Sequence, residues 1–163
     1  MTVGEGRQNL RTAFSITQAV PDDLAQITAC AARAYQRYIK PMGKRPAPMD
    51  ADFAAHIRAG EICVARRDRD RSVVIGYVVF YPQCDAMQLE NVAVDPDCQG
   101  SGIGRALIET VERTARQNRL PCVCLYTNEK MTENLRLYPS LGYRETERRT
   151  EQGFNRVYFR KDL

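Results

Sequence analysis

The stretch that decides the fold runs from Leu89 to Leu107 and reads LENVAVDPDCQGSGIGRAL. An apolar segment is followed by a turn at residues 95–97, by glycines at positions 100, 102 and 104, and then by a helical pattern. The first amides of a helix lack intrahelical partners and carry partial positive charge from the helix dipole. A glycine-rich entry therefore lets phosphate oxygens contact backbone N–H groups. The stretch predicts an anion-binding turn between a strand and a helix.

Two well-known phosphate loops do not fit this turn. The P-loop requires a lysine directly after its last glycine, whereas Gly104 is followed by Arg105 and Ala106. The dinucleotide pattern G-x-G-x-x-G fails as well, because the residue three positions after Gly102 is Arg105. A plain glycine-rich turn without any ligand remains the alternative.

The strand before the turn changes its apolar face. Met87 and Leu89 have one parity and Val92 and Val94 the other, so one face stays apolar only if an extra residue is inserted near Glu90–Asn91. Such a bulge leaves backbone groups unpaired and opens a slot that an extended ligand can enter. A strand buried on both faces is the alternative, because parity then carries no information.

Composition narrows the class of protein. The 163 residues are 44% hydrophobic, which suits one ordinary core. We expect a flexible N-terminal extension at 1–12 and a single domain at 13–163. No apolar run is long enough to cross a bilayer, and the first residues lack the apolar segment of a signal peptide. We therefore expect a cytoplasmic protein without a membrane partner.

The reactive side chains and the charges exclude several functions. None of the six cysteines forms a C-x-x-C pair, and the only histidine is His56, so we expect free thiols and no metal. The net charge is +4, but basic and acidic residues alternate, as at 66–71. A nucleic-acid partner is therefore not expected.

The order of the remaining elements follows from periodicity and from turn residues. A first helix starts at the Pro21-Asp22-Asp23 turn and ends before Pro41, and Asp50 caps a second, short helix. Glu109/Arg113 and Glu112/Arg116 are expected as exposed pairs on the third helix. Strands are expected at 14–19, 62–66, 73–81, 87–94, 122–127, 143–149 and 154–160, and the later helices at about 103–118 and 128–141, with Gly142 as the C′ residue of the last one.

The second half contains another motif, NLRLYPSLGY, at 134–143. It resembles N-x-x-x-Y-x-x-x-G-[FY] of the GNAT family of N-acetyltransferases, and Gln99–Gly104 resembles Q/R-x-x-G-x-G/A, the pyrophosphate loop of that family. The resemblance runs from about Val74 to the C-terminus and includes the element order. It implies an α/β (α+β) fold, in which helices flank a mixed, mostly antiparallel central sheet, and it implies acetyl-CoA as cosubstrate.

The resemblance also implies the contacts of the cosubstrate. The slot beside the bulge would take the pantetheine arm, and Asn134 and Tyr138 lie on one helix face. Pro139, inside that helix, departs from a regular pattern and leaves the direction of the Tyr138 hydroxyl open. The implied cofactor contacts are Val92, Ala93, Val94, Gln99, Gly100, Ser101, Gly102, Ile103, Gly104, Arg105, Asn128, Asn134, Leu137 and Tyr138.

Acetyl transfer to an amine needs three functional groups. An alkylamine with a pKa of about 10.4 must lose a proton, which costs about 4 kcal/mol at neutral pH. Glu90 beside the bulge is the expected base, directly or through water, and an exposed strand glutamate is the alternative. The Val92 N–H is expected to stabilise the oxyanion. Tyr138 is expected to protonate the leaving thiolate, against the alternative of a packing tyrosine.

The sequence defines the acceptor substrate least well. The resemblance places the first two helices and the last hairpin around it, with Tyr35, Tyr38, Lys40, Arg45 and residues 150–153 as neighbours. We expect the primary amine of a small polar molecule, attacked directly in a ternary complex. A protein N-terminus or lysine is the second choice, and a non-catalytic acyl-CoA-binding module is the alternative from another class. Whether the protein forms a homodimer is left open.

Overall fold

The computed structural model describes residues 13–163, so the extension expected at 1–12 lies outside the described residues. Seven strands form one sheet in the order β1-β2-β3-β4-β5-β7-β6, and only the β4–β5 pair is parallel. The expected mixed, mostly antiparallel sheet is therefore confirmed. The strands are β1 (Phe14–Gln18), β2 (Ile62–Arg67), β3 (Asp70–Gln83), β4 (Ala86–Val94), β5 (Cys122–Asn128), β6 (Arg144–Glu151) and β7 (Phe154–Asp162).

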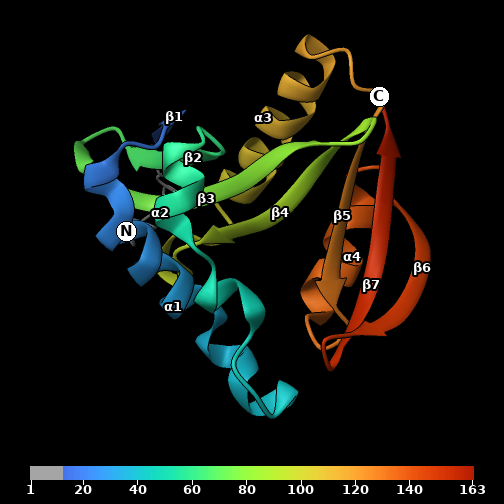
Figure 1. Ribbon diagram of the computed structural model, residues 1–163. Helices are drawn as coiled ribbons and strands as arrows, with labels where there is room; N and C mark the ends of the chain where they lie inside the picture. Colours follow the sequence, from blue (N-terminus) through green and yellow to red (C-terminus); the bar gives the residue numbers. More distant parts are fainter. Residues whose placement is uncertain (1–12) are drawn as a thin grey trace, which may run out of the picture.

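Helices cover both faces of the sheet (Figure 1). Helices α1 and α2 pack on one face over β1–β4, and α3 and α4 pack on the other. None of the helices in the described part of the chain has both the length and the apolar character needed to cross a bilayer. The helices are α1 (Leu24–Met42), α2 (Phe53–Arg58), α3 (Ile103–Gln117) and α4 (Thr132–Ser140), and the 3₁₀ turns are η1 (Pro21–Asp23), η2 (Ala47–Asp50) and η3 (Pro96–Cys98).

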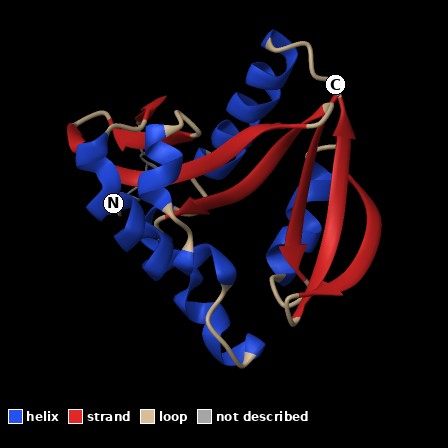
Figure 2. Cartoon of the chain, in the orientation of Figure 1, coloured by secondary structure: helices blue, strands red, loops and turns tan. Residues whose placement is uncertain are grey.

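The bulge predicted in β4 is present. Asn91 pairs with Val79 and Leu89 pairs with Phe80, so Glu90 between them has no partner on β3. On its other side, β4 pairs with β5 only at Met87–Leu89. Beyond these residues the two strands diverge (Figure 2). The strand edges of β4 and β5 are therefore unpaired where the glycine turn and α4 approach them.

Three helix boundaries differ from expectation. Helix α1 continues through Pro41, which falls in its last turn and removes only one backbone bond there, and it ends at Gly43 with φ 68°. Helix α2 is capped by Asp52, whose Oδ1 accepts from the Ala55 N–H at 2.9 Å. Asp50, the residue predicted for this role, instead pairs with Arg45. The helix predicted from residue 128 begins at Thr132.

The predicted charge pairs on α3 are wrong. Glu109 pairs with Arg105 at 2.9 Å, one turn towards the helix start. Glu112 is only 6% exposed, and its carboxylate accepts from Lys161 of β7 at 2.9 Å and from the Tyr143 hydroxyl at 3.1 Å. A cation from a distant strand thus neutralises this carboxylate, which i,i+4 spacing could not indicate.

Candidate active site

Two cavities meet between the diverging strands. The first, of about 320 Å³, lies beside the glycine turn between α1, α3 and α4. The second, of about 250 Å³, lies between the α1–α2 region and the β6–β7 hairpin. Tyr35, Val92, Asn134 and Tyr138 line both cavities. A group held in the first cavity can therefore contact a molecule held in the second.

The glycine turn has the backbone shape of an anion site. Gly100 and Gly102 adopt φ values of 79° and 86°, and Gly102 is the N-cap of α3. A Cβ built on either residue meets no atom within 4 Å, so their left-handed backbone, and not crowding, requires glycine. The first amides of α3 consequently face the first cavity without intrahelical partners.

Most of the predicted cofactor contacts line the first cavity. They are Val92, Ala93, Val94, Gln99, Gly100, Gly102, Gly104, Arg105, Asn134, Leu137 and Tyr138. Three do not: the Ser101 hydroxyl donates to the Cys98 carbonyl, Ile103 is buried in the core, and Asn128 lines the second cavity. Ser101 and Ile103 could contribute only through backbone groups.

Tyr35 of α1 holds the bulge. Its hydroxyl lies 2.8 Å from Asn91 Oδ1 and 2.9 Å from the Val92 carbonyl, and it can donate to one of them at a time. Burial raises the pKa of Tyr35 well above its usual value, so it stays a donor. A strand residue directs its N–H and C=O to the same side. Because the Val92 carbonyl faces Tyr35 and the cavities, the Val92 N–H faces that side too.

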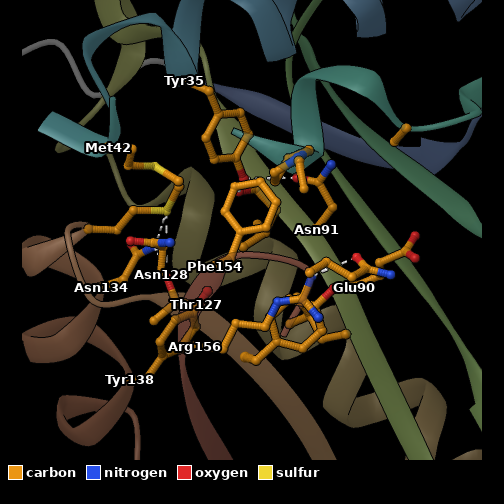
Figure 3. A pocket seen from close by; sticks show the side chains of 18 of the residues that line it. Tyr35, Met42, Glu90, Asn91, Thr127, Asn128, Asn134, Tyr138, Phe154 and Arg156 are labelled. Carbon is orange, nitrogen blue, oxygen red and sulfur yellow. Dashed lines mark hydrogen bonds between the residues drawn. The ribbon is translucent and has the colours of Figure 1, made fainter. Parts of the chain in front are cut away.

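Tyr138 belongs both to the core and to the cavities. Its ring is 3% exposed and packs against Tyr143 and Phe159, with centroids 5.9 and 5.5 Å away. Burial, and to a lesser extent Tyr38, raises the pKa of Tyr138 above its usual value, and no hydrogen bond to another residue of the described chain contributes. Its side chain approaches from the side opposite Tyr35 (Figure 3). Tyr138 is thus a protonated hydroxyl at the junction of the cavities.

Asn134 lies one turn before Tyr138. Its amide nitrogen donates to the Thr127 hydroxyl of β5 at 3.0 Å, which fixes the side chain and leaves the amide oxygen available to a ligand N–H.

Pro139 does not end the helix, because α4 continues to Ser140 and Gly142 follows with φ 90° as the predicted C′ residue.

Glu90 lines the second cavity (Figure 3). The Tyr81 hydroxyl donates to its Oε1 at 3.3 Å, and Nε2 of His56 lies 2.9 Å from its Oε2. Burial, followed by the charge of Glu90, raises the pKa of Tyr81 to about 12. The carboxylate is therefore near a donor and a basic ring, which differs from the surroundings of an ordinary exposed strand glutamate.

The second cavity has acidic and apolar walls. Asp52 and Glu90 contribute negative charge, whereas the cation of Arg156 is neutralised by Glu151 at 2.8 Å and lies over the Tyr126 ring. Next to this cavity, Lys44 donates to the Gly153 carbonyl and its Nζ lies 3.7 Å from the centroid of the ring of Phe154, which lines the cavity. The loop after α1 thus touches the β6–β7 turn beside the second cavity.

Sequence comparison agrees with this geometry. The family model described as "Acetyltransferase (GNAT) domain" matches residues 58–145, which include the bulged strand and the glycine turn. The chain belongs to the GNAT acetyltransferase family. Solved structures similar to this chain include acetyltransferases in complex with coenzyme A or acetyl coenzyme A.

Curated relatives of this GNAT chain match a short segment. A mycothiol acetyltransferase of Acidothermus cellulolyticus is 47% identical over 53 residues, covering 32% of this chain and 16% of that protein. One from Thermobifida fusca is 46% identical over 52 residues, with the same coverage. The matched segment thus spans about a sixth of the length of these relatives.

Solved structures share the whole fold at low identity. The PaiA N-acetyltransferase of Thermoplasma acidophilum, in complex with coenzyme A, has a TM-score of 0.77 and 14% identity over 93% of this chain and 99% of that one. The ribosomal-protein-S18-alanine N-acetyltransferase of Escherichia coli has a TM-score of 0.72 and 20% identity, with coverages of 92% and 94%. These likenesses show the fold of the GNAT chain and not its acceptor.

The structure brings only some of the predicted acceptor neighbours to the second cavity of this GNAT chain. Tyr35 and Gln152 line it, but Tyr38 lines the first cavity, and neither Lys40 nor Arg45 lines either one. A single histidine predicts no metal site, so the sequence assigns no role to His56, yet this residue lies in the second cavity beside Glu90. One sequence feature bears on its position: Phe53 and Ile57 form the buried face of α2, and His56 lies at the border of that face.

The glycine turn supplies a first testable prediction for this GNAT protein. Gly102→Val should weaken coenzyme A binding at least tenfold, about 1.4 kcal/mol, because a β-branched residue resists φ 86° and displaces the first amides of α3. Gly102→Asn is the matched control, since asparagine tolerates this conformation and should lose less affinity. Titration calorimetry measures both variants, and circular dichroism checks their folding. Equal affinity in all three proteins would exclude the turn as the binding site.

Proposed function

We propose that the protein is an acetyl-CoA-dependent N-acetyltransferase that acetylates a primary amine of a small polar molecule. The observation that carries the proposal is the junction of the two cavities at Tyr35, Val92, Asn134 and Tyr138. An acyl thioester in the first cavity and an amine in the second would meet there, so direct attack in a ternary complex needs no covalent enzyme intermediate.

The residues around the junction suit the three tasks of the reaction. Glu90 of the bulge would accept the proton of the acceptor ammonium, directly or through one water. The Val92 N–H, on the open side of β4, would donate to the developing oxyanion. The Tyr138 hydroxyl would donate to the departing thiolate. The left-handed glycines at 100 and 102 fit a pyrophosphate at the start of α3.

The acceptor class follows from charge and from the entrance. The neutralised Arg156 leaves Asp52 and Glu90 as the charges of the second cavity, which attract an ammonium group. The contact of Lys44 with the β6–β7 turn joins two segments that flank the second cavity, which would favour a small molecule over a segment of a folded protein. The curated relatives are named as acetyltransferases, which supports acetyl as the transferred group.

The decisive experiment is a thiol-release assay. The protein is mixed with acetyl-CoA and a panel of small amines, amino acid amides and peptides with free N-termini, and products are identified by mass spectrometry. Small amines should release thiol in equal amount to acetylated product, whereas acetyl-CoA alone should release little. Turnover with peptides alone would replace the small-molecule acceptor by a protein N-terminus. Binding of acetyl-CoA without turnover on any amine would favour a non-catalytic acyl-CoA-binding module.

A further inference from the structure

The only histidine of the chain lies between two carboxylates. Nδ1 of His56 is 2.7 Å from Oε2 of Glu61, and Nε2 is 2.9 Å from Oε2 of Glu90. All three side chains are partly buried, with 19% of the His56 side chain, 29% of that of Glu61 and 30% of that of Glu90 exposed. We call these three residues, Glu61, His56 and Glu90, the Glu-His-Glu row. The row begins at Glu90 in the second cavity and ends at Glu61, directly before β2.

The imidazole is held from several directions. His56 lies in the last turn of α2, and its carbonyl accepts from the Glu61 N–H at 2.9 Å, which fixes the distance between the two residues. Its ring stacks on that of Tyr81 of β3, with an interplanar angle of 9°. The backbone therefore fixes Glu61, and the stack on Tyr81 limits rotation of the ring. An ordinary surface histidine would have neither constraint.

The row has too few N–H groups for its two carboxylates. A neutral imidazole carries one N–H, so it can donate to only one of the two carboxylates. Oε2 of Glu90 is inaccessible to solvent and has no aligned hydrogen-bond donor, although Nε2 is only 2.9 Å away. Nε2 of His56 and Oε2 of Glu90 are nevertheless close enough for a proton to pass between them after a small rotation of either side chain.

We propose that His56 is a positioning residue that orients Glu90 and relays the proton of the acceptor amine from Glu90 to Glu61. The proposal rests on the proposed function, because it assigns the route of the proton that acetylation of an amine must release. The acceptor ammonium transfers its proton to Glu90 and keeps the electron pair of the N–H bond. Nε2 of His56 takes that proton while Nδ1–H passes its own to Glu61. Glu61 then releases one proton to water, and exchange of the ring proton with water returns His56, 19% exposed, to the Nδ1–H tautomer before the next turnover. One proton therefore leaves for each amine acetylated.

Charged and titratable groups from several segments surround the row. Tyr81 of β3 contacts both Glu90 and the ring, and Tyr126 of β5 senses the charge of Glu90. Asp52, the N-cap residue of α2, lines the same cavity as His56. Arg156 of β7 lines the cavity as well, and Glu151 neutralises its cation at 2.8 Å. The groups in contact with the ring are Glu61, Glu90 and Tyr81, two acids and a phenol.

Glu61→Gln is the most direct test, because Glu61 touches His56 but does not line the cavity. It should lower kcat about tenfold, within the range of acid–base effects, and leave the KM for acetyl-CoA unchanged. The pH profile of kcat should also differ from that of the parent, because Glu61 is the group that passes the proton to water. Glu145→Gln, an exposed glutamate paired with Arg148 on β6, is the matched control.

Two further variants separate relay from structure. His56→Phe keeps a ring against Tyr81 but has no nitrogen, so it should be at least as slow as Glu61→Gln. Added imidazole should restore part of the kcat of His56→Ala and should leave the kcat of Glu145→Gln unchanged. Because the chain has one histidine, its ring-nitrogen NMR signals are unambiguous, and the Nδ1 signal should move in Glu61→Gln only.

The outcomes distinguish the relay from the proposed function. A parent-like kcat and pH profile in Glu61→Gln and His56→Phe, while the parent acetylates amines, would overturn the relay and leave the function intact. A loss of thermal stability without a change in the pH profile would make the row structural. Absence of turnover in the parent on every amine would overturn the proposed function itself.

Discussion

Replacement of Tyr138 by phenylalanine should lower kcat about a hundredfold or more and leave the affinity for acetyl-CoA nearly unchanged. The ring packs against Tyr143 and Phe159, and phenylalanine keeps these contacts. Only the hydroxyl is lost, and with it the proton that would go to the departing thiolate. Because burial raises the pKa of Tyr138, the parent should show no alkaline loss of activity from this residue near pH 10, its usual range.

Tyr143→Phe provides the matched control for this prediction. Tyr143 is buried beside Tyr138 and donates to Glu112 at 3.1 Å, but it lines neither cavity. Its variant should lose stability of about 1 kcal/mol and keep its kcat. A thioester with a more acidic thiol should rescue Tyr138→Phe, since its leaving group needs less protonation. A loss that appears in acetyl-CoA affinity instead would make the Tyr138 hydroxyl a positioning contact.

Glu90→Gln should lower kcat/KM for the amine about a hundredfold at pH 7. The change removes the charge and preserves the shape of a side chain that already contacts Tyr81. An alkylamine has a pKa of about 10.4, so its neutral fraction rises tenfold for each unit of pH in the range below this value. Part of the activity should therefore return as the pH rises towards 10.

Glu147→Gln is the control for charge loss alone, because Glu147 is half exposed on β6 and pairs with Arg149. It should follow the parent at every pH. If Glu90→Gln also ran parallel to the parent, another carboxylate or water would be accepting the proton. Steady-state rates from pH 6 to about 10 give the comparison.

The features that follow from local sequence rules were predictable. The parity change between Leu89 and Val92 requires a bulge wherever one face stays apolar, and Glu90 is indeed unpaired. Glycines at 100 and 102 require a left-handed backbone between a strand and a helix, and both have positive φ. Spacing of four residues places Asn134 and Tyr138 on one face of α4, and both line the two cavities.

The features that the sequence did not predict depend on contacts between segments that are distant in the chain. The neighbours of Glu90 come from α2 and β3, and no periodicity in the chain relates position 56 to position 90. The burial of Glu112 depends on Lys161, which is 49 residues away. Tyr35 is predicted as a neighbour of the acceptor. For the same reason, the sequence does not predict the hydrogen bond of its hydroxyl to the Val92 carbonyl beside the bulge.

The short parallel pairing of β4 with β5 has a consequence for local stability. Three positions of each strand form this seam, whereas β3 and β4 pair over most of their lengths. Local opening should therefore begin at the free ends of the seam, where few backbone bonds must break. A ligand that spans the gap binds only the closed arrangement and so lowers the population of opened states by mass action. The cosubstrate would then act as a removable cross-strand link, and unfolding of the two parts of the sheet would become more cooperative whenever it is bound.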